Sequence, residues 1–266
     1  MSGRFDAHIH LFETGYHGTR ESGAELADYE ALRAVHGIDD ALVVGYEGQP
    51  RFHGNNEYVL GLGRELGWVT PLLHLDPERP LSIAAAEAAL DAGAAGFSIY
   101  LGDDGALIDA FSDELWSLLG ARTALLSVNA TPEGLRGASE RIRALDTVRV
   151  LISHLGLPGA TAGRADQNAA LLALHTAESV TVKFSGLYAI DPVAPHHGAR
   201  DTALAVLDSF GAARMLWGSD FAPGLDTVRA EELFAVPAWL AEQLTPAESA
   251  QILGGTLRTL CGKDTP

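Results

Sequence analysis

The chain has 266 residues, of which 47% are hydrophobic, and this is enough to bury the core of one α/β barrel. Its 18 Lys and Arg against 35 Asp and Glu give a formal charge of −17, which disfavours nucleic acid and anionic membranes as partners. The single cysteine, Cys261, excludes an internal disulfide and a cysteine-based metal knuckle. No signal-peptide pattern and no apolar run of about 20 residues is present, so we expect a soluble cytoplasmic protein.

Short runs of β-branched and aliphatic residues recur along the chain, and a stretch with helical periodicity follows each of them. They predict eight strands, at residues 4–11, 41–46, 68–75, 96–101, 124–129, 148–154, 180–185 and 215–219. Several of the helical stretches open on a Ser, Thr or Asp cap and close on glycine. The last stretch, TPAESAQILGGTLRTLCG, predicts a further pair of helices after the eighth strand.

The strands ALVVGY, TALLSV and RVLIS are almost continuously apolar, as expected for a parallel sheet that is buried on both faces. Eight such strands most simply close into a barrel. The alternative, an open doubly wound sheet, lacks its usual glycine-rich fingerprint, because HIHLFETGYHG follows the start of the first strand. We therefore predict an α/β fold, a (β/α)8 TIM barrel, that forms a single domain over residues 1–266 with extra C-terminal helices.

Residues capable of chemistry lie at the carboxyl ends of the predicted strands, where barrel enzymes place their active sites. His8 and His10 lie on the first strand, and the alternation of strand side chains predicts that they face the same side. His154 ends the sixth strand and Asp220 follows the eighth. Imidazoles and a carboxylate suit zinc or a similar ion, and Asp220 could accept the proton of an activated water. His154 could polarise a substrate carbonyl.

Four further side chains are candidate contacts for a substrate. Arg51 lies in a polar loop after the second strand, where it could bind a substrate carboxylate or simply be solvated. Lys183 lies inside the seventh strand, and we expect it to reach the barrel mouth because an unpaired buried ammonium is costly. Tyr100 and Asn129 end the fourth and fifth strands and could offer hydrogen bonds, although an aromatic side chain there can also merely pack.

The segments DAHIHLF, LISHLG, VKFSGLY and LWGSDF resemble the signature strands of the amidohydrolase superfamily over almost the whole chain. More narrowly the chain resembles the amidohydrolase-related (amidohydrolase 2) branch, which includes lactonases and non-oxidative decarboxylases. The WGSD strand end is the most specific marker. The resemblance implies that His8 and His10 are strand-one metal ligands, that His154 lies near the substrate carbonyl and that Asp220 is the acid or base.

Two departures from the family pattern concern the metal. The fourth strand, GFSIYLGDD, offers Tyr100 where dinuclear members carry a bridging Lys or Glu, so a two-metal site is not expected. The fifth strand, ALLSVNATP, carries Ser127 and Asn129 where mononuclear members usually present a histidine. The resemblance thus implies one divalent ion, zinc or manganese, on His8, His10 and Asp220. Activity without a metal stays open, since some lactonases of the branch keep these residues and work without one.

Three functions remain in consideration. The leading one is hydrolysis of a small-molecule lactone, ester or amide, with water activated by Asp220 and the carbonyl polarised by a metal or by histidines. The second is non-oxidative decarboxylation of an aromatic or enoic acid, although such decarboxylases generally keep the strand-five histidine that is missing here. The third is a barrel that only binds a ligand. The sequence does not indicate an oligomeric state.

Overall fold

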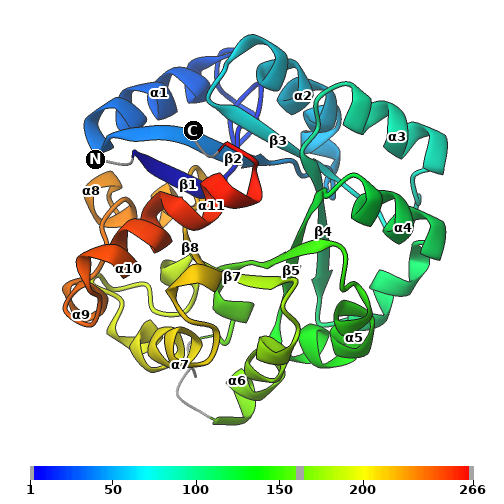
Figure 1. The fold of residues 1–266 in the computed structure, drawn as a ribbon. Helices are drawn as coiled ribbons and strands as arrows, with labels where there is room; N and C mark the ends of the chain where they lie inside the picture. The colour runs from blue at the N-terminus through cyan, green and yellow to red at the C-terminus, as the bar shows by residue number, and fades with distance from the viewer. Residues whose placement is uncertain (1–2, 160–164, 264–266) are drawn as a thin grey trace.

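The computed structural model describes residues 3–159 and 165–263. Eight parallel strands lie side by side in chain order and are surrounded by helices (Figure 1). The predicted (β/α)8 TIM barrel is therefore confirmed. The strands are β1 (Arg4–Ile9), β2 (Ile38–Val44), β3 (Val69–His74), β4 (Gly96–Gly102), β5 (Leu125–Ala130), β6 (Arg149–Ile152), β7 (Val180–Phe184) and β8 (Met215–Trp217).

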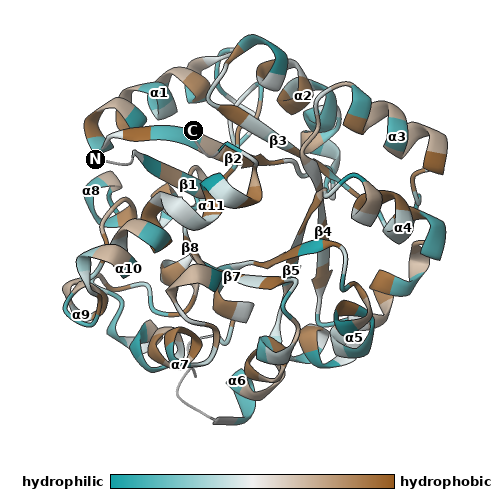
Figure 2. Cartoon of the chain, viewed as in Figure 1, coloured by the Kyte–Doolittle hydropathy of each residue, from teal (hydrophilic) through white to brown (hydrophobic). Residues whose placement is uncertain are grey.

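The outer helices connect successive strands and have polar and apolar residues alternating along them (Figure 2). They are α1 (Ala24–His36), α2 (Asn55–Glu65), α3 (Ile83–Asp91), α4 (Asp113–Ala121), α5 (Pro132–Ala144), α6 (Ala165–Leu172) and α7 (Arg200–Phe210). After β8 come the short helices α8 (Ala230–Leu233), α9 (Ala238–Ala241), α10 (Pro246–Ala250) and α11 (Thr256–Leu260). In the described part of the chain, no helix has both the length and the apolar character needed to cross a membrane.

The expected C-terminal helix pair corresponds to α10 and α11, joined by a turn of π-helix over Gln251–Gly255. These helices pack at the end of the barrel where the strands begin. Arg258 donates a hydrogen bond of 3.3 Å to the carbonyl of Gly3, and its guanidinium lies 4.7 Å from the ring centre of Phe5. The end of the barrel opposite the strand carboxyl termini is thereby covered.

Apolar side chains fill two layers. The larger layer lies between the strands and the outer helices, and the smaller one fills the barrel interior. The interior layer contains Phe5, Ala7, Leu42, Val44, Leu72, Leu125, Leu151, Leu216 and Leu257. Because these residues pack the start of the barrel, polar side chains are accommodated inside it only towards the strand ends.

The barrel closes where β1 meets β8. Ile9 pairs with Phe221 in a parallel bridge, and the backbone N–H of Asp220 donates a hydrogen bond of 2.8 Å to the carbonyl of His8. The N–H of His10 donates to the carbonyl of Phe221 across the same seam. Closure of the barrel therefore also brings the segment with both histidines next to Asp220.

The carboxylate of Asp6 holds this seam from the helix side. One of its oxygens accepts hydrogen bonds from the backbone N–H groups of His8, at 3.2 Å, and Ser219, at 2.8 Å. The other oxygen accepts a hydrogen bond from the hydroxyl of Tyr29 in α1. Burial raises the pKa of Asp6 to about 6, while the hydrogen bonds from Ser219 and His8 act in the opposite direction.

A bulge in β1 separates Asp6 from the two histidines. Three residue steps from Asp6 to Ile9 face only two steps along β2. Strict alternation would put Asp6, His8 and His10 on one face of the strand. Instead, Asp6 contacts α1, whereas His8 and His10 contact each other within the barrel. Bulges change the direction of side chains in this way. Simple alternation therefore does not account for the separation of Asp6 from His8 and His10.

We expect Asp6→Ala to lower the free energy of unfolding by about 3 kcal/mol, because it leaves buried N–H groups without an acceptor. Asp6→Asn should stay within about 1 kcal/mol of wild type, since its amide oxygen can accept the same N–H groups and no buried charge remains. Urea unfolding followed by circular dichroism measures both. Equal losses in the two variants would show that the carboxylate does not hold the seam.

Candidate active site

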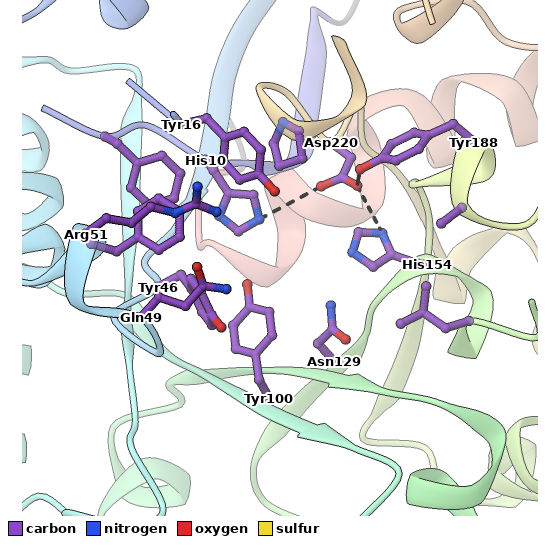
Figure 3. A pocket seen from close by; sticks show the side chains of 15 residues that line it. His10, Tyr16, Tyr46, Gln49, Arg51, Tyr100, Asn129, His154, Tyr188 and Asp220 are labelled. Atoms are coloured by element: carbon purple, nitrogen blue, oxygen red, sulfur yellow. Dashed lines mark hydrogen bonds and ion pairs between the residues drawn. The ribbon is translucent and has the colours of Figure 1, made fainter. Parts of the chain in front are cut away.

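The structure brings His8, His10, His154 and Asp220 together at the carboxyl ends of β1, β6 and β8. The Nε2 atoms of His8 and His10 lie 3.2 Å apart, and they are 3.7 Å and 3.9 Å from Oδ1 of Asp220. Nδ1 of His154 lies 3.8 Å from Oδ2 of the same carboxylate. Figure 3 shows Asp220 between His10 and His154. Three imidazoles therefore surround one carboxylate.

The remaining ring nitrogens of the two strand-one histidines have different neighbours. Nδ1 of His10 lies 2.7 Å from the carbonyl of Val44, to which it can only donate. Nδ1 of His8 lies 3.2 Å from Nζ of Lys183, which also donates a hydrogen bond of 2.8 Å to Ser127. His10 thus presents Nε2 as an acceptor, which faces Nε2 of His8 at 3.2 Å, whereas His8 lies between an amine and the carboxylate of Asp220.

Asp220 is held in an unusual backbone conformation. Its φ angle is 63°, a left-handed value that costs a residue with a side chain about 1–3 kcal/mol. The hydroxyl of Tyr188 donates a hydrogen bond of 2.6 Å to Oδ2 of Asp220. Burial first, and then the charge of Asp220, raise the pKa of Tyr188, so its hydroxyl keeps the proton that it donates. The other carboxylate oxygen, Oδ1, receives no hydrogen bond from Tyr188.

His154 is positioned by the segment that follows β7. Its own φ angle is 53°, again left-handed. Nδ1 of His154 lies 3.0 Å from the hydroxyl of Ser185. The next residue, Gly186, has φ of +60°, and a Cβ atom there would lie 2.4 Å from Nδ1 of His154. The close approach of the backbone to the imidazole therefore requires glycine at this position.

All three imidazoles are neutral at pH 7. Burial lowers the pKa of His10 to about 4, with Asp220 opposing the change, and lowers the pKa of His154 in the same way. Burial also holds the pKa of His8 well below its usual range, helped by the charge of Lys183. A neutral imidazole has one lone pair and one N–H, so each ring can accept or coordinate through one nitrogen and donate through the other.

A cavity of about 300 Å³ opens onto these groups. Its walls come from β4 and β5 and from the segments after β1, β2, β6, β7 and β8 (Figure 3). The lining side chains are those of His10, Phe12, Tyr16, Tyr46, Gln49, Arg51, Phe52, Tyr100, Asn129, His154, Leu157, Tyr188, Ala189, Asp220 and Pro223. His8 lies behind His10, and its side chain is fully buried.

Of the four predicted substrate contacts, Arg51, Tyr100 and Asn129 line the cavity. Tyr100 and Asn129 are paired in register on β4 and β5, and both direct their polar ends into the cavity (Figure 3). Lys183, expected at the barrel mouth, does not line it. Its side chain is fully buried beneath His8, where hydrogen bonds to Ser127 and His8 take the place of water.

Several residues of the site were not in the predicted set. Ser185 contacts His154, and Ser127 contacts Lys183. Ser127 and Ser185 lie at the ends of predicted strands, which is a signal that the sequence does contain. The aromatic walls formed by Tyr16 and Tyr46 come from loops, whose conformation the sequence pattern does not specify.

The donor set is suitable for a divalent ion. Ligand atoms of His8, His154 and Asp220 all lie within 4.8 Å of one another, and imidazole with carboxylate is the chemistry that zinc favours. The hydrogen bond from His10 to the carbonyl of Val44 also has the form that orients metal-bound histidines. Lys183 differs, because it presents a donor and a positive charge to the second nitrogen of His8.

The chain thus combines an eight-stranded barrel with His8, His10, His154 and Asp220 at its strand ends. This is the arrangement that the resemblance to the amidohydrolases implied. The model of the amidohydrolase-2 family, described as Amidohydrolase, matches residues 5–260. The chain therefore belongs to this family, as the resemblance implied. Family membership supports an enzyme. None of the curated proteins matches the chain.

Solved structures with the same fold include an amidohydrolase from Burkholderia multivorans with bound zinc, with a TM-score of 0.83, 20% identity and coverage of 98% of this chain and 99% of that one. A protein from Pseudomonas putida, assigned as a 2-pyrone-4,6-dicarboxylic acid hydrolase, gives 0.76, 24% identity and 100% of both chains. A 2,6-dihydroxybenzoate decarboxylase from Rhizobium gives 0.58, 13% identity and 100% of both chains. At these identities the likeness establishes the fold alone.

We expect Lys183→Met to raise the affinity of the protein for zinc by about tenfold or more, in the range of second-shell effects on metal sites. The substitution removes the charge that would repel an ion on His8. Zinc titration against a chromophoric chelator measures the affinity. Lys263→Met, at the opposite end of the barrel beside Asp40, is the control and should leave it unchanged. Equal zinc affinity in wild type and Lys183→Met would contradict this role for Lys183.

We expect Gly186→Ala to reduce turnover about 100-fold, since a displacement of about 1 Å at a reacting group has an effect of that size. The added methyl group would push His154 away from Asp220. Gly61→Ala is the matched control, because its Cβ would meet nothing within 4 Å. Steady-state kinetics of both variants, with thermal unfolding to verify folding, test the expectation. Unchanged turnover in Gly186→Ala would mean that the placement of His154 is not critical.

Proposed function

We propose that this protein is a hydrolase that opens a lactone or related ester of a small molecule. The observation that supports this most directly is the surroundings of Asp220. Its carboxylate faces the cavity among three neutral imidazoles, one of its oxygens is bound by Tyr188, and the other is free to accept a proton. A general base requires this combination of access, orientation and a vacant acceptor.

Asp220 acts as the base in the proposed reaction. Oδ1 accepts the proton of a water molecule as the water attacks the lactone carbonyl, and Tyr188 keeps the carboxylate oriented through Oδ2. When the ring C–O bond breaks, Asp220 returns the proton to the leaving alkoxide. The products are a carboxylic acid and a hydroxyl group on the same molecule, and the acid then loses its proton to the solvent, so atoms and charges balance with water as the only co-reactant.

His154 is the proposed donor to the carbonyl oxygen. If the hydroxyl of Ser185 donates to Nδ1, the imidazole proton resides on Nε2. That N–H can stabilise the negative charge that develops on the carbonyl oxygen as water adds. His10 lines the cavity as well, and the carbonyl of Val44 fixes its orientation.

A divalent ion, when bound by His8 or His10 with His154 and Asp220, would supply a Lewis acid and lower the pKa of a coordinated water. The zinc bound to the Burkholderia multivorans amidohydrolase, together with the ligand set here, supports this cofactor. We propose zinc or manganese as this ion. The base and the hydrogen-bond donors described above are side chains of the chain itself.

The alternatives are separated by the product that forms. The fold is shared with a decarboxylase, but the fifth strand here presents Ser127 and Asn129 instead of the histidine that such enzymes generally carry. A decarboxylase would release CO2, whereas lactone hydrolysis releases a proton without CO2. A barrel that only binds ligands would show neither product.

We expect Asp220→Asn to lower kcat about 1,000-fold, which is within the range for loss of a general base. Proton release from a panel of five- and six-membered lactones, followed by indicator dye with and without chelator, measures the loss. The control is Asp226→Asn, an exposed aspartate on the same loop that pairs with His17 at 2.9 Å. It should retain wild-type turnover.

Two outcomes would contradict the proposal. Lactone hydrolysis that persists in Asp220→Asn would remove this residue from the role of base. Release of CO2 from an aromatic or enoic acid, with no lactone turned over, would replace the hydrolase assignment by the decarboxylase one.

A further inference from the structure

We propose that the substrate carries a single carboxylate, bound by Arg51 at the end of the cavity away from Asp220. This inference deepens the proposed function and rests on it. It defines the substrate class as small monocarboxylated lactones, in contrast to neutral lactones and to dicarboxylates. The argument depends on the partners of Arg51, on the distribution of charge around the cavity and on a buried polar group that lacks a partner there.

Arg51 differs from the other described arginines because it has no polar partner among the described residues. It belongs to the short helical turn Pro50–Phe52 after β2, and it makes no hydrogen bond or ion pair within residues 3–159 and 165–263. Every other arginine in those ranges binds a carboxylate or a backbone carbonyl. In a chain with 35 acidic residues, a free guanidinium at a cavity is available for an anion that comes from outside.

Aromatic rings hold this guanidinium in place. Its central carbon lies 4.5 Å from the ring centre of Phe52 and 5.4 Å from that of Tyr16. Phe52 in turn stacks on Phe12 at 4.3 Å. Figure 3 shows Arg51 with its guanidinium end turned toward the cavity. Stacking on faces leaves the in-plane N–H groups of the guanidinium free, and these N–H groups bind a carboxylate in bidentate geometry.

Charge is divided between two sides of the cavity. Among its lining residues, Asp220 is the one acid and Arg51 the one arginine or lysine. The two lie on different sides of the space in Figure 3, with Asp220 near His154 and Arg51 beyond His10. A substrate carboxylate would be repelled by Asp220 and attracted by Arg51. Binding in this orientation leaves the uncharged lactone carbonyl beside Asp220 and His154, where the proposed reaction takes place.

Uncharged polar groups line the space between these two ends. The hydroxyl of Tyr100 is buried without a hydrogen-bond partner among the described residues, and the half-buried side chain of Asn129 lines the cavity next to it. A buried polar group without a partner is costly, so it indicates where a ligand supplies the missing hydrogen bond. Tyr100 and Asn129 are suited to the oxygen atoms of a ring, and they carry no charge that would bind a second carboxylate.

The number of free cations argues for one carboxylate. Lys183 does not supply a second cation to the cavity, because it lies outside the lining, enclosed by His8 and Ser127. A dicarboxylate would place its second negative charge among Tyr100, Asn129 and Asp220, where the lining offers no second Arg or Lys side chain to pair with it. A neutral lactone would leave Arg51 solvated and make no use of it.

The test uses two lactones that share one ring, γ-carboxy-γ-butyrolactone and γ-hydroxymethyl-γ-butyrolactone. Isothermal titration of each lactone into the Asp220→Asn protein measures binding without turnover. We expect the carboxylated lactone to bind about tenfold or more tightly than the neutral one, as charge-assisted hydrogen bonds predict. Arg51→Gln should remove this preference without weakening the neutral lactone. Arg51→Lys should retain part of it, because lysine keeps the charge without the bidentate geometry.

Arg143→Gln, on α5 outside the cavity, is the matched control and should leave both affinities unchanged. Equal binding of the two lactones, binding of neither, or a preference that survives Arg51→Gln overturns the proposal. Turnover of the same two lactones by wild-type protein distinguishes failure of the carboxylate-site proposal from failure of the proposed lactonase function. Hydrolysis of both lactones at equal kcat/KM would refute the carboxylate site while supporting a lactonase. Hydrolysis of no lactone in a panel that includes dicarboxylated and phosphorylated rings would refute the lactonase itself.

Discussion

Closure of the barrel between β1 and β8 is the constraint on which the site depends. The same backbone hydrogen bonds that join the first and last strands place His8 and His10 against Asp220. The carboxylate of Asp6 supports this seam from the helix side by accepting N–H groups from both strands. Residues far apart in the chain thus become neighbours through the interaction that completes the fold, so the stability of the barrel and the geometry of the site are coupled.

The second organising feature is a small set of buried charges. Lys183 and Asp220 lie on opposite sides of the His8 ring, and each reduces the cost of burying the other. Burial lowers the pKa of Lys183 to about 7, whereas the charges of Asp220 and Asp6 raise it. The imidazoles between them stay neutral, which keeps their nitrogens available for hydrogen bonding or for a metal ion.

Backbone strain is concentrated at the reacting groups. Asp220 and His154 both adopt left-handed φ angles, of 63° and 53°, which residues with side chains seldom adopt. Surrounding contacts compensate, since Tyr188 binds Asp220 and the segment around Gly186 packs against His154. Such strain fixes the direction of a side chain more tightly than a relaxed strand end would. The backbone conformation therefore helps to position both the proposed base, Asp220, and the proposed donor, His154.

The sequence by itself determined the strand and helix order, the barrel, and the convergence of His8, His10, His154 and Asp220, because apolar periodicity and the position of residues at strand ends are local properties. It could not determine the β1 bulge that separates Asp6 from the histidines. Nor could it place Lys183 beneath His8 or show that Arg51 alone among the described arginines lacks a polar partner. These features arise from contacts between residues distant in the chain, and only the tertiary structure decides which of those contacts form.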